Sequence, residues 1–171
     1  LGTSSLWEDK VEIGRGWSYG AETFLQKNFG KLTGWVGYTW SKTERQFDNI
    51  NNGEVFPYKY DRRHDFSLVL NVQIDSLWSL SGTWVYGTGN AVTLATVRYN
   101  SLDPGSYSYF NENVVQTFNK KNEFRMASYH RVDIGLKREK KKKWGNLIWN
   151  FGVYNAYNRK NPFYYYFGYD D

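Results

Sequence analysis

The sequence predicts an all-β fold, an antiparallel up-and-down meander of about six long strands. The clearest observation is the segment from His64 to Ile74, where even positions after the first are apolar and odd positions, except Val69, are polar. This period of two is typical of a strand with one apolar and one polar face. The pattern recurs in about five further segments, and no stretch has the spacing expected of a helix.

Length and composition are consistent with this class. The 171 residues suit one domain, 1–171. Aromatic residues make up 20% of the chain and the mean hydropathy is −0.71, as in all-β surfaces that include transmembrane barrels. The absence of cysteine excludes a disulfide framework and a thiolate metal site. No apolar run approaches the about 18 residues of a membrane helix. The start at Leu1, without Met or a signal peptide, predicts a mature product, an excised domain or a fragment.

The first two strands are predicted at about 18–27 and 32–43, joined by a short turn in which Gly30 supplies a positive φ. One face of the first strand carries Tyr19, Ala21, Thr23 and Leu25. A polar link rich in Asn, 44–60, follows as a long loop.

The third and fourth strands are predicted at about 64–74 and 78–86, with a tight turn between them. A second long loop, 87–128, follows, within which short strand extensions are expected at 91–97 and 114–118. A loop of this length in a compact domain is usually functional.

The fifth and sixth strands are predicted at about 129–138 and 146–157. The connections therefore alternate between short and long, which places all short turns at one edge of the sheet. Outer-membrane barrels have this asymmetry, with short periplasmic turns and long outer loops.

A basic run, Lys140 to Lys143 beside Lys137 and Arg138, carries much of the net charge of +5. It fits either a patch for nucleic acid or anionic lipid, or a solvated turn between two strands. The turn is favoured because apolar alternation resumes directly afterwards, and we expect no nucleic-acid partner.

Alternation alone does not separate a soluble sandwich from a barrel wall. The barrel is favoured because the strands are about ten residues long, beyond the usual five or six, and because the polar face carries small hydrogen-bonding residues suited to a lumen. The apolar face is also predicted to carry aromatic residues near strand ends, as interfacial girdles do. These are Trp78, Tyr86, Tyr129 and Trp144.

About six strands are too few for a membrane barrel, since single-chain barrels begin at eight. Either the long loop adds two strands, or the chain is part of a larger barrel, or it pairs with other copies. The residues predicted to face lipid are Phe66, Leu68, Leu70, Trp84, Val132, Ile134, Trp149 and Phe151.

The most site-like cluster is Asp61-Arg62-Arg63-His64-Asp65, which would suit a metal or an acid–base site. Neighbours in an extended strand point to opposite faces, so an ion-paired strand start, with Arg63 between the two carboxylates, is favoured.

Arg131 and Asp133 form a second predicted ion pair on the polar face. The two histidines, His64 and His130, are predicted on the outward face near the rim, with too few other ligands for zinc. No catalytic or cofactor motif is present, so the sequence predicts no enzyme, no metal and no cofactor.

Aromatic residues of the second long loop, Tyr107, Tyr109, Phe110 and Phe118, fit either stacking on a sugar or an aromatic chelate, or packing within the loop. No ligand-binding residue is assigned.

Five segments, which cover most of residues 14–167, together resemble the C-terminal barrel region of TonB-dependent outer-membrane receptors. They are GWSYGAETFLQKNFGKLTGWVGYTWSKTERQF, FPYKYDRRHDFSLVLN, WSLSGTWVYGTGNAVTL, YHRVDIGLKR and WNFGVYNAYNRKNPF. The resemblance implies a cell outer membrane location and a large barrel filled by a plug. It also implies import of a scarce nutrient, such as an iron chelate, a vitamin or a glycan, with energy from an inner-membrane complex.

The resemblance further predicts a fragment without plug domain and without final strand, because the chain stops at Gly168–Asp171. Its role would be that of a barrel wall without independent transport. The expected partners are lipid, the rest of the barrel and plug, and, for the isolated segment, other copies of itself. The alternative is a soluble aromatic-rich β-sandwich module that binds carbohydrate.

Overall fold

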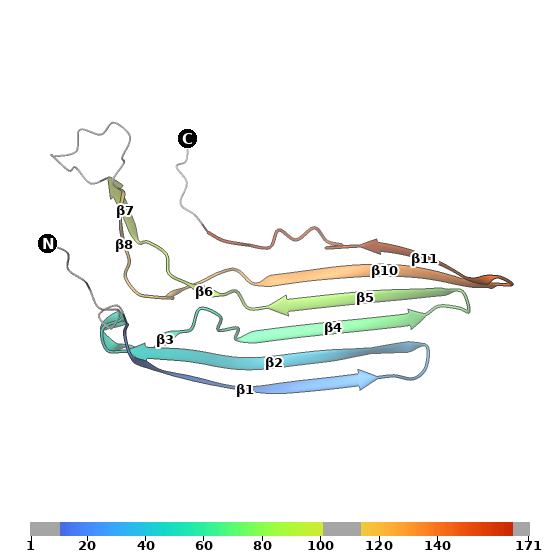
Figure 1. The fold of residues 1–171 in the computed structure, drawn as a ribbon, viewed down its shortest axis with the longest axis horizontal. Coiled ribbons are helices and arrows are strands. Elements are labelled where there is room, and N and C mark those ends of the chain that lie inside the picture. The colour runs from blue at the N-terminus through green and yellow to red at the C-terminus, as the bar shows by residue number, and fades with distance from the viewer. Residues whose placement is uncertain (1–10, 101–113, 166–171) are drawn as a thin grey trace. The chain divides into compact units, whose positions relative to one another are not determined.

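The computed structural model describes residues 11–100 and 114–165 and is all-β. Its main sheet is open and antiparallel, in the order β1-β2-β4-β5-β10-β11 (Figure 1). This is the predicted meander of six long strands. The strands are β1 (Gly14–Lys27), β2 (Leu32–Phe47), β4 (His64–Gln73), β5 (Trp78–Gly87), β10 (Tyr129–Lys142) and β11 (Gly145–Val153).

The chain divides into two compact units. The sheet unit comprises residues 19–42, 62–89 and 126–171, and holds β4, β5, β10 and β11 with most of β1 and β2. The loop unit comprises residues 1–18, 43–61 and 90–125, and holds the two long connections with the neighbouring ends of β1 and β2.

The register of the sheet unit aligns its apolar positions across strands. Leu68 of β4 lies opposite Val36 of β2 and Trp84 of β5. Trp84 lies opposite Val132 of β10. Directly opposite residues of an antiparallel pair project to the same face, so these positions form one continuous apolar face.

Short turns join β1 to β2, β4 to β5 and β10 to β11. Gly30 has φ +82° in the first turn, a conformation that glycine adopts without steric cost. In the second turn, Asp75 Oδ1 accepts hydrogen bonds from the amides of Leu77 (2.7 Å) and Trp78 (2.8 Å). This local side-chain bond explains why the hairpin reverses at Asp75.

Gly34 is required by close approach within the sheet. Its φ is +149°, and a Cβ at this position would lie 2.1 Å from the Val69 carbonyl oxygen of β4. Any side chain would therefore push β2 away from its neighbour.

Four strand ends differ from the prediction. β1 begins at Gly14 instead of about 18. β10 ends at Lys142 instead of about 138, so most of the basic run predicted as a turn lies in the strand. β2 continues to Phe47, into the predicted loop 44–60, because β3 (Phe56–Pro57) pairs with residues Glu44 and Arg45. β11 stops at Val153 instead of about 157. The chain turns there, with Asn155 at φ +53°.

The loop unit contains short elements of its own. A 3-10 turn, η2 (Asn51–Gly53), precedes β3, and β6 (Ala91–Val92) pairs with β9 (Phe124–Arg125). β7 (Val97–Asn100) and β8 (Val114–Thr117) form a second two-stranded sheet. Short strands were predicted at 91–97 and 114–118. The structure has β6 and the start of β7 in the first range and β8 in the second.

Burial is concentrated in the loop unit. Among the described residues, the buried hydrophobic side chains are Phe56 (4% exposed) and Ala91 (1% exposed), and both belong to this unit. The described part of the sheet unit therefore has long, fully paired inner strands but no buried hydrophobic core. No helix in the described ranges is long and apolar enough to cross a membrane.

Candidate functional surfaces

The apolar face of the sheet unit is the largest candidate functional surface. Its side chains remain partly open, with exposed fractions of 38% for Leu70, 44% for Ile134 and 56% for Phe151. None of the described hydrophobic residues of this face is buried. A soluble sheet normally buries such a face against a second layer.

The eight residues predicted to face lipid lie together on this face. The register places Phe66 opposite Tyr86, and Ile134 opposite Val153. Phe66 and Trp84 also pack with ring centroids 4.9 Å apart. The shared face is thus present in the structure, whereas contact with lipid stays a prediction.

One predicted girdle residue is on the wrong face. Tyr129 lies opposite Gly87, on the polar face, and its hydroxyl accepts a hydrogen bond from Arg131 Nη1 at 2.9 Å. Tyr86 and Trp78 lie on the apolar face, opposite His130 and Arg138. Alternation along β10 groups Tyr129 with Arg131 and Asp133, so its assignment to the apolar face was wrong.

The polar face carries an ion-pair cluster centred on Arg131. Arg131 binds Asp133 through Nη2 (2.9 Å) and Nε (3.0 Å), so the predicted pair is confirmed. The guanidinium also stacks 4.0 Å from the Tyr154 ring centroid and bonds the Tyr154 hydroxyl. Asp133 Oδ1 in turn accepts a hydrogen bond from the amide of Asn155 (2.9 Å). Both charges are therefore compensated within the face.

A shallow hollow of about 300 Å³ opens on the same polar face. It is lined by Arg62, Asp65, Ser67 and Tyr129 together with Val85, Tyr86 and Gly87. Arg62 and Asp65 form an ion pair at 3.3 Å, half exposed to solvent. An exposed pair of this kind adds little stability, at most about 1 kcal/mol.

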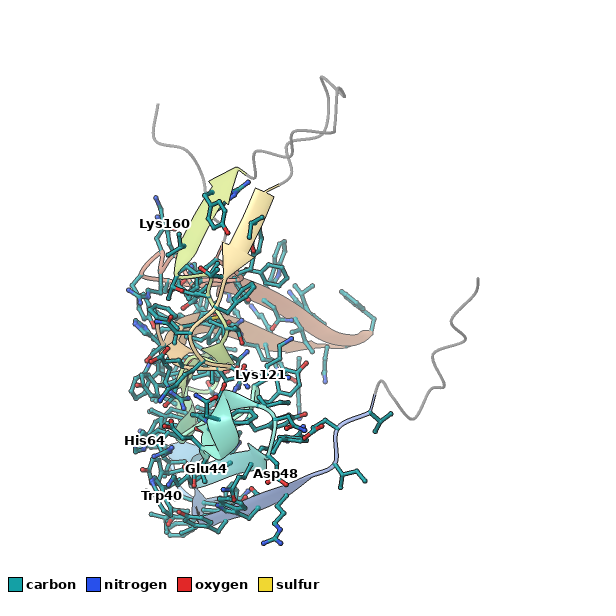
Figure 2. All side chains as sticks on the ribbon, turned by 90° about the vertical axis from the view of Figure 1, so that its left-hand side faces the viewer. Trp40, Glu44, Asp48, His64, Lys121 and Lys160 are labelled. Carbon is teal, nitrogen blue, oxygen red and sulfur yellow. The ribbon has the colours of Figure 1, made fainter. Side chains whose placement is uncertain are left out.

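The two histidines are each held by a tyrosine. His64 Nδ1 lies 2.9 Å from the Tyr38 hydroxyl, and His130 Nδ1 lies 2.7 Å from the Tyr157 hydroxyl. Figure 2 shows His64 beside Trp40, its register partner on β2. β5 separates the two histidine strands. Within the described ranges, no group of three His, Cys, Asp or Glu residues could hold a metal ion.

Asn161 replaces a missing strand beside His130. β11 has ended, and the Asn161 side chain accepts from the His130 amide (3.0 Å) and donates to its carbonyl (2.9 Å). One carboxamide thus supplies both bonds of a strand partner. Residues 161–165 form no strand.

The loop unit has its own polar centre at Asp61, whose side chain is 0% exposed. Arg125 Nη2 binds Asp61 Oδ2 at 2.6 Å, and Arg125 Nη1 donates to the Asp61 carbonyl at 2.7 Å. The Thr43 amide donates to Asp61 Oδ1 at 2.7 Å. Asp61 lies before β4 begins, so it is not part of that strand.

Two asparagines tie the long connections together. The Asn122 side chain donates a hydrogen bond to the Pro57 carbonyl at 2.9 Å, and the Asn122 backbone N–H donates to Thr93 Oγ1 at 3.0 Å. Asn51 accepts from the Lys121 amide at 2.7 Å and donates to the Lys121 carbonyl at 3.2 Å. The two predicted long loops therefore contact each other through backbone-directed side chains.

Lys120 and Glu54 add a surface ion pair between the same two segments. The hydrogen bond from Lys120 to Glu54 raises the pKa of the Lys120 ammonium above its ordinary value. Stability from this pair is present below that ordinary pKa and is lost as pH rises through the raised pKa.

The predicted loop aromatics Tyr107, Tyr109 and Phe110 lie outside the described residues. Phe118 is described and is 54% exposed. Sequence reasoning missed Arg125, Asn122 and Asn161, because each acts on a residue about 30 or more positions away.

Comparison with known proteins adds no relative. The chain matches no family model, no curated protein and no solved structure.

Proposed function

We propose that the sheet unit forms part of the wall of a transmembrane β-barrel, with its apolar face toward lipid. The observation that carries the proposal is the continuous, uncovered apolar face opposite a polar face with compensated charges. In hydrocarbon, this exposure is favourable because no second layer is needed to remove the face from water.

Strand length supports the proposal. The inner strands β4 and β5 have ten residues each, and β2 and β10 have 16 and 14. A tilted strand needs about 9 to 11 residues to cross a bilayer. The excess in β2 and β10 would project beyond the membrane.

The open edges indicate what else the barrel needs. β1 and β11 are the outer strands of the sheet, and all 14 residues of β1 are exposed. Each backbone amide left unpaired at a sheet edge in lipid costs roughly several kcal/mol of folding free energy. The sheet would therefore pair with the remaining strands of a larger barrel or, in isolation, with other copies of itself.

The segments that resemble TonB-dependent receptors suggest which barrel this is. On that reading, the chain is a wall segment of an outer-membrane receptor that imports an iron chelate, a vitamin or a glycan. Transport, the plug and coupling to an inner-membrane complex belong to the intact receptor. The chain itself has a structural role.

The first test is detergent dependence, read by light scattering of the purified chain in plain buffer and in a mild detergent. We expect the chain to associate in plain buffer and to form a monodisperse protein–detergent complex in the mild detergent. A monodisperse monomer in plain buffer would instead support a soluble carbohydrate-binding module and overturn the wall assignment.

A matched pair of variants controls for general loss of folding. Leu70→Arg places a charge on the apolar face, and Asn71→Arg places it on the polar face of the same strand. In bilayers, we expect Leu70→Arg to cost about 2 to 4 kcal/mol of folding free energy if it lies near the midplane, and Asn71→Arg much less. Equal costs in a lipid refolding titration would contradict the predicted lipid face.

A further inference from the structure

The hairpin β10–β11 carries cations at its turn end, on the same face as the apolar surface. Arg138 lies opposite Trp78 of β5 and Trp149 of β11. Lys140 lies opposite Leu147 of β11. Lys142, the next residue on the same face, lies closer to the turn, opposite Gly145. Moving toward the turn, this face of β10 therefore passes from Val, Ile and Leu to Arg, Lys and Lys.

Among the described residues, these three cations have no carboxylate partner. The Arg138 guanidinium lies 5.4 Å from the Trp78 ring centroid, and its Nε is buried without a hydrogen-bond partner among the described residues. In the same described ranges, Lys140 and Lys142 have no carboxylate within ion-pair distance. By contrast, Lys137 on the polar face pairs with Glu139 at 2.7 Å.

The order of side chains matches the order of environments along a bilayer normal. Aliphatic residues suit the hydrocarbon, tryptophan suits the interface, and cations suit the level of lipid phosphates. The Arg138 guanidinium can bind two phosphate oxygens at once, whereas each lysine ammonium acts as a point charge.

We propose that Arg138, Lys140 and Lys142 bind the phosphate groups of anionic phospholipids at the membrane surface nearest the short turns. This inference rests on the proposed function, because it requires the apolar face to be in lipid. On this proposal the basic run contacts lipid phosphates, whereas a solvated turn would contact only water.

The test measures flotation of the full chain with two kinds of vesicle, one of phosphatidylcholine alone and one containing about a third phosphatidylglycerol. We expect tighter binding to the anionic vesicles, with a preference that declines as salt screens the charges. Lys140→Gln with Lys142→Gln should reduce that preference by about fivefold per lysine. Arg138→Lys, which keeps the charge but loses the fork, should also reduce it.

The control variant combines Lys137→Gln with Lys141→Gln, which removes the same charge from polar-face positions of β10. It should change the preference much less. Equal losses in the two double variants, or no anionic preference in the unaltered chain, would overturn this inference while leaving the barrel wall intact. Failure to bind either vesicle would overturn the proposed function itself.

Discussion

At the residue scale, Asp61 shows how one carboxylate organises a unit whose described residues bury few hydrophobic side chains. Its side chain is fully buried, and Arg125 and the Thr43 amide each bond one of its oxygens. A buried charge is stable only when it is paired and hydrogen-bonded. Arg125 is 64 positions away, so the pair joins the two long connections of the loop unit.

The same pair makes a prediction. Arg125→Ala removes a partner of a buried charge, so we expect it to destabilise the loop unit by about 3 to 5 kcal/mol. Limited proteolysis should then cleave the segments around Asp61 and Arg125 faster. Lys120→Ala, which removes only an exposed pair, is the control and should leave cleavage nearly unchanged. An Arg125→Ala protein with unaltered cleavage would show that Arg125 does not hold the segments together.

At the scale of elements, strand pairing depends on where backbones approach closely. β2 meets β4 at Gly34, which has φ +149° and no room for a Cβ beside Val69. Gly82 of β5 has open space where its Cβ would lie. Both glycines lie directly opposite Leu70 of β4, Gly34 on the neighbouring strand β2 and Gly82 on the neighbouring strand β5.

These two glycines form a matched pair for mutation. Gly34→Ala should destabilise the β2–β4 pairing by at least about 1 to 3 kcal/mol, because it strains the backbone and adds a clash. Gly82→Ala should be neutral or slightly stabilising, because alanine loses less entropy in a strand. Hydrogen exchange of β2 amides measures the effect, and equal protection in both variants would refute the close-approach argument.

At the scale of the whole molecule, the sheet unit depends on an environment that covers its apolar face. No described hydrophobic side chain of that unit is buried. Burial of apolar surface is the main favourable term in folding. The long strands and their hydrogen bonds would then define the structure without supplying much of its stability in water.

A consequence is that folding should be cooperative only when that face is covered. We expect near-ultraviolet circular dichroism of the many tryptophans to show a sharp thermal transition in detergent and a broad one in plain buffer. The protein is kept at the same low concentration in both media, which controls for association. A sharp transition in buffer, with the chain monomeric, would contradict this prediction.

Much of the element pattern was predictable. Period-two alternation located all six long strands within a few residues at most ends, because each strand has an apolar and a polar face. Strand ends were harder, since β2 is lengthened by β3 and β11 is cut short where Asn161 replaces it. Tyr129 was wrongly assigned to the apolar face, although alternation within the strand already groups it with Arg131 and Asp133, and its register partner Gly87 agrees.

The sequence by itself determined the strands, the turns and the two-faced character of the sheet, because these depend on neighbours only a few positions apart. Only the tertiary structure decided the partners of Asp61 and His130, the open edges, and the absence of a covering layer in the described ranges. These depend on contacts between distant segments, and no local pattern of side chains encodes which segment will supply them.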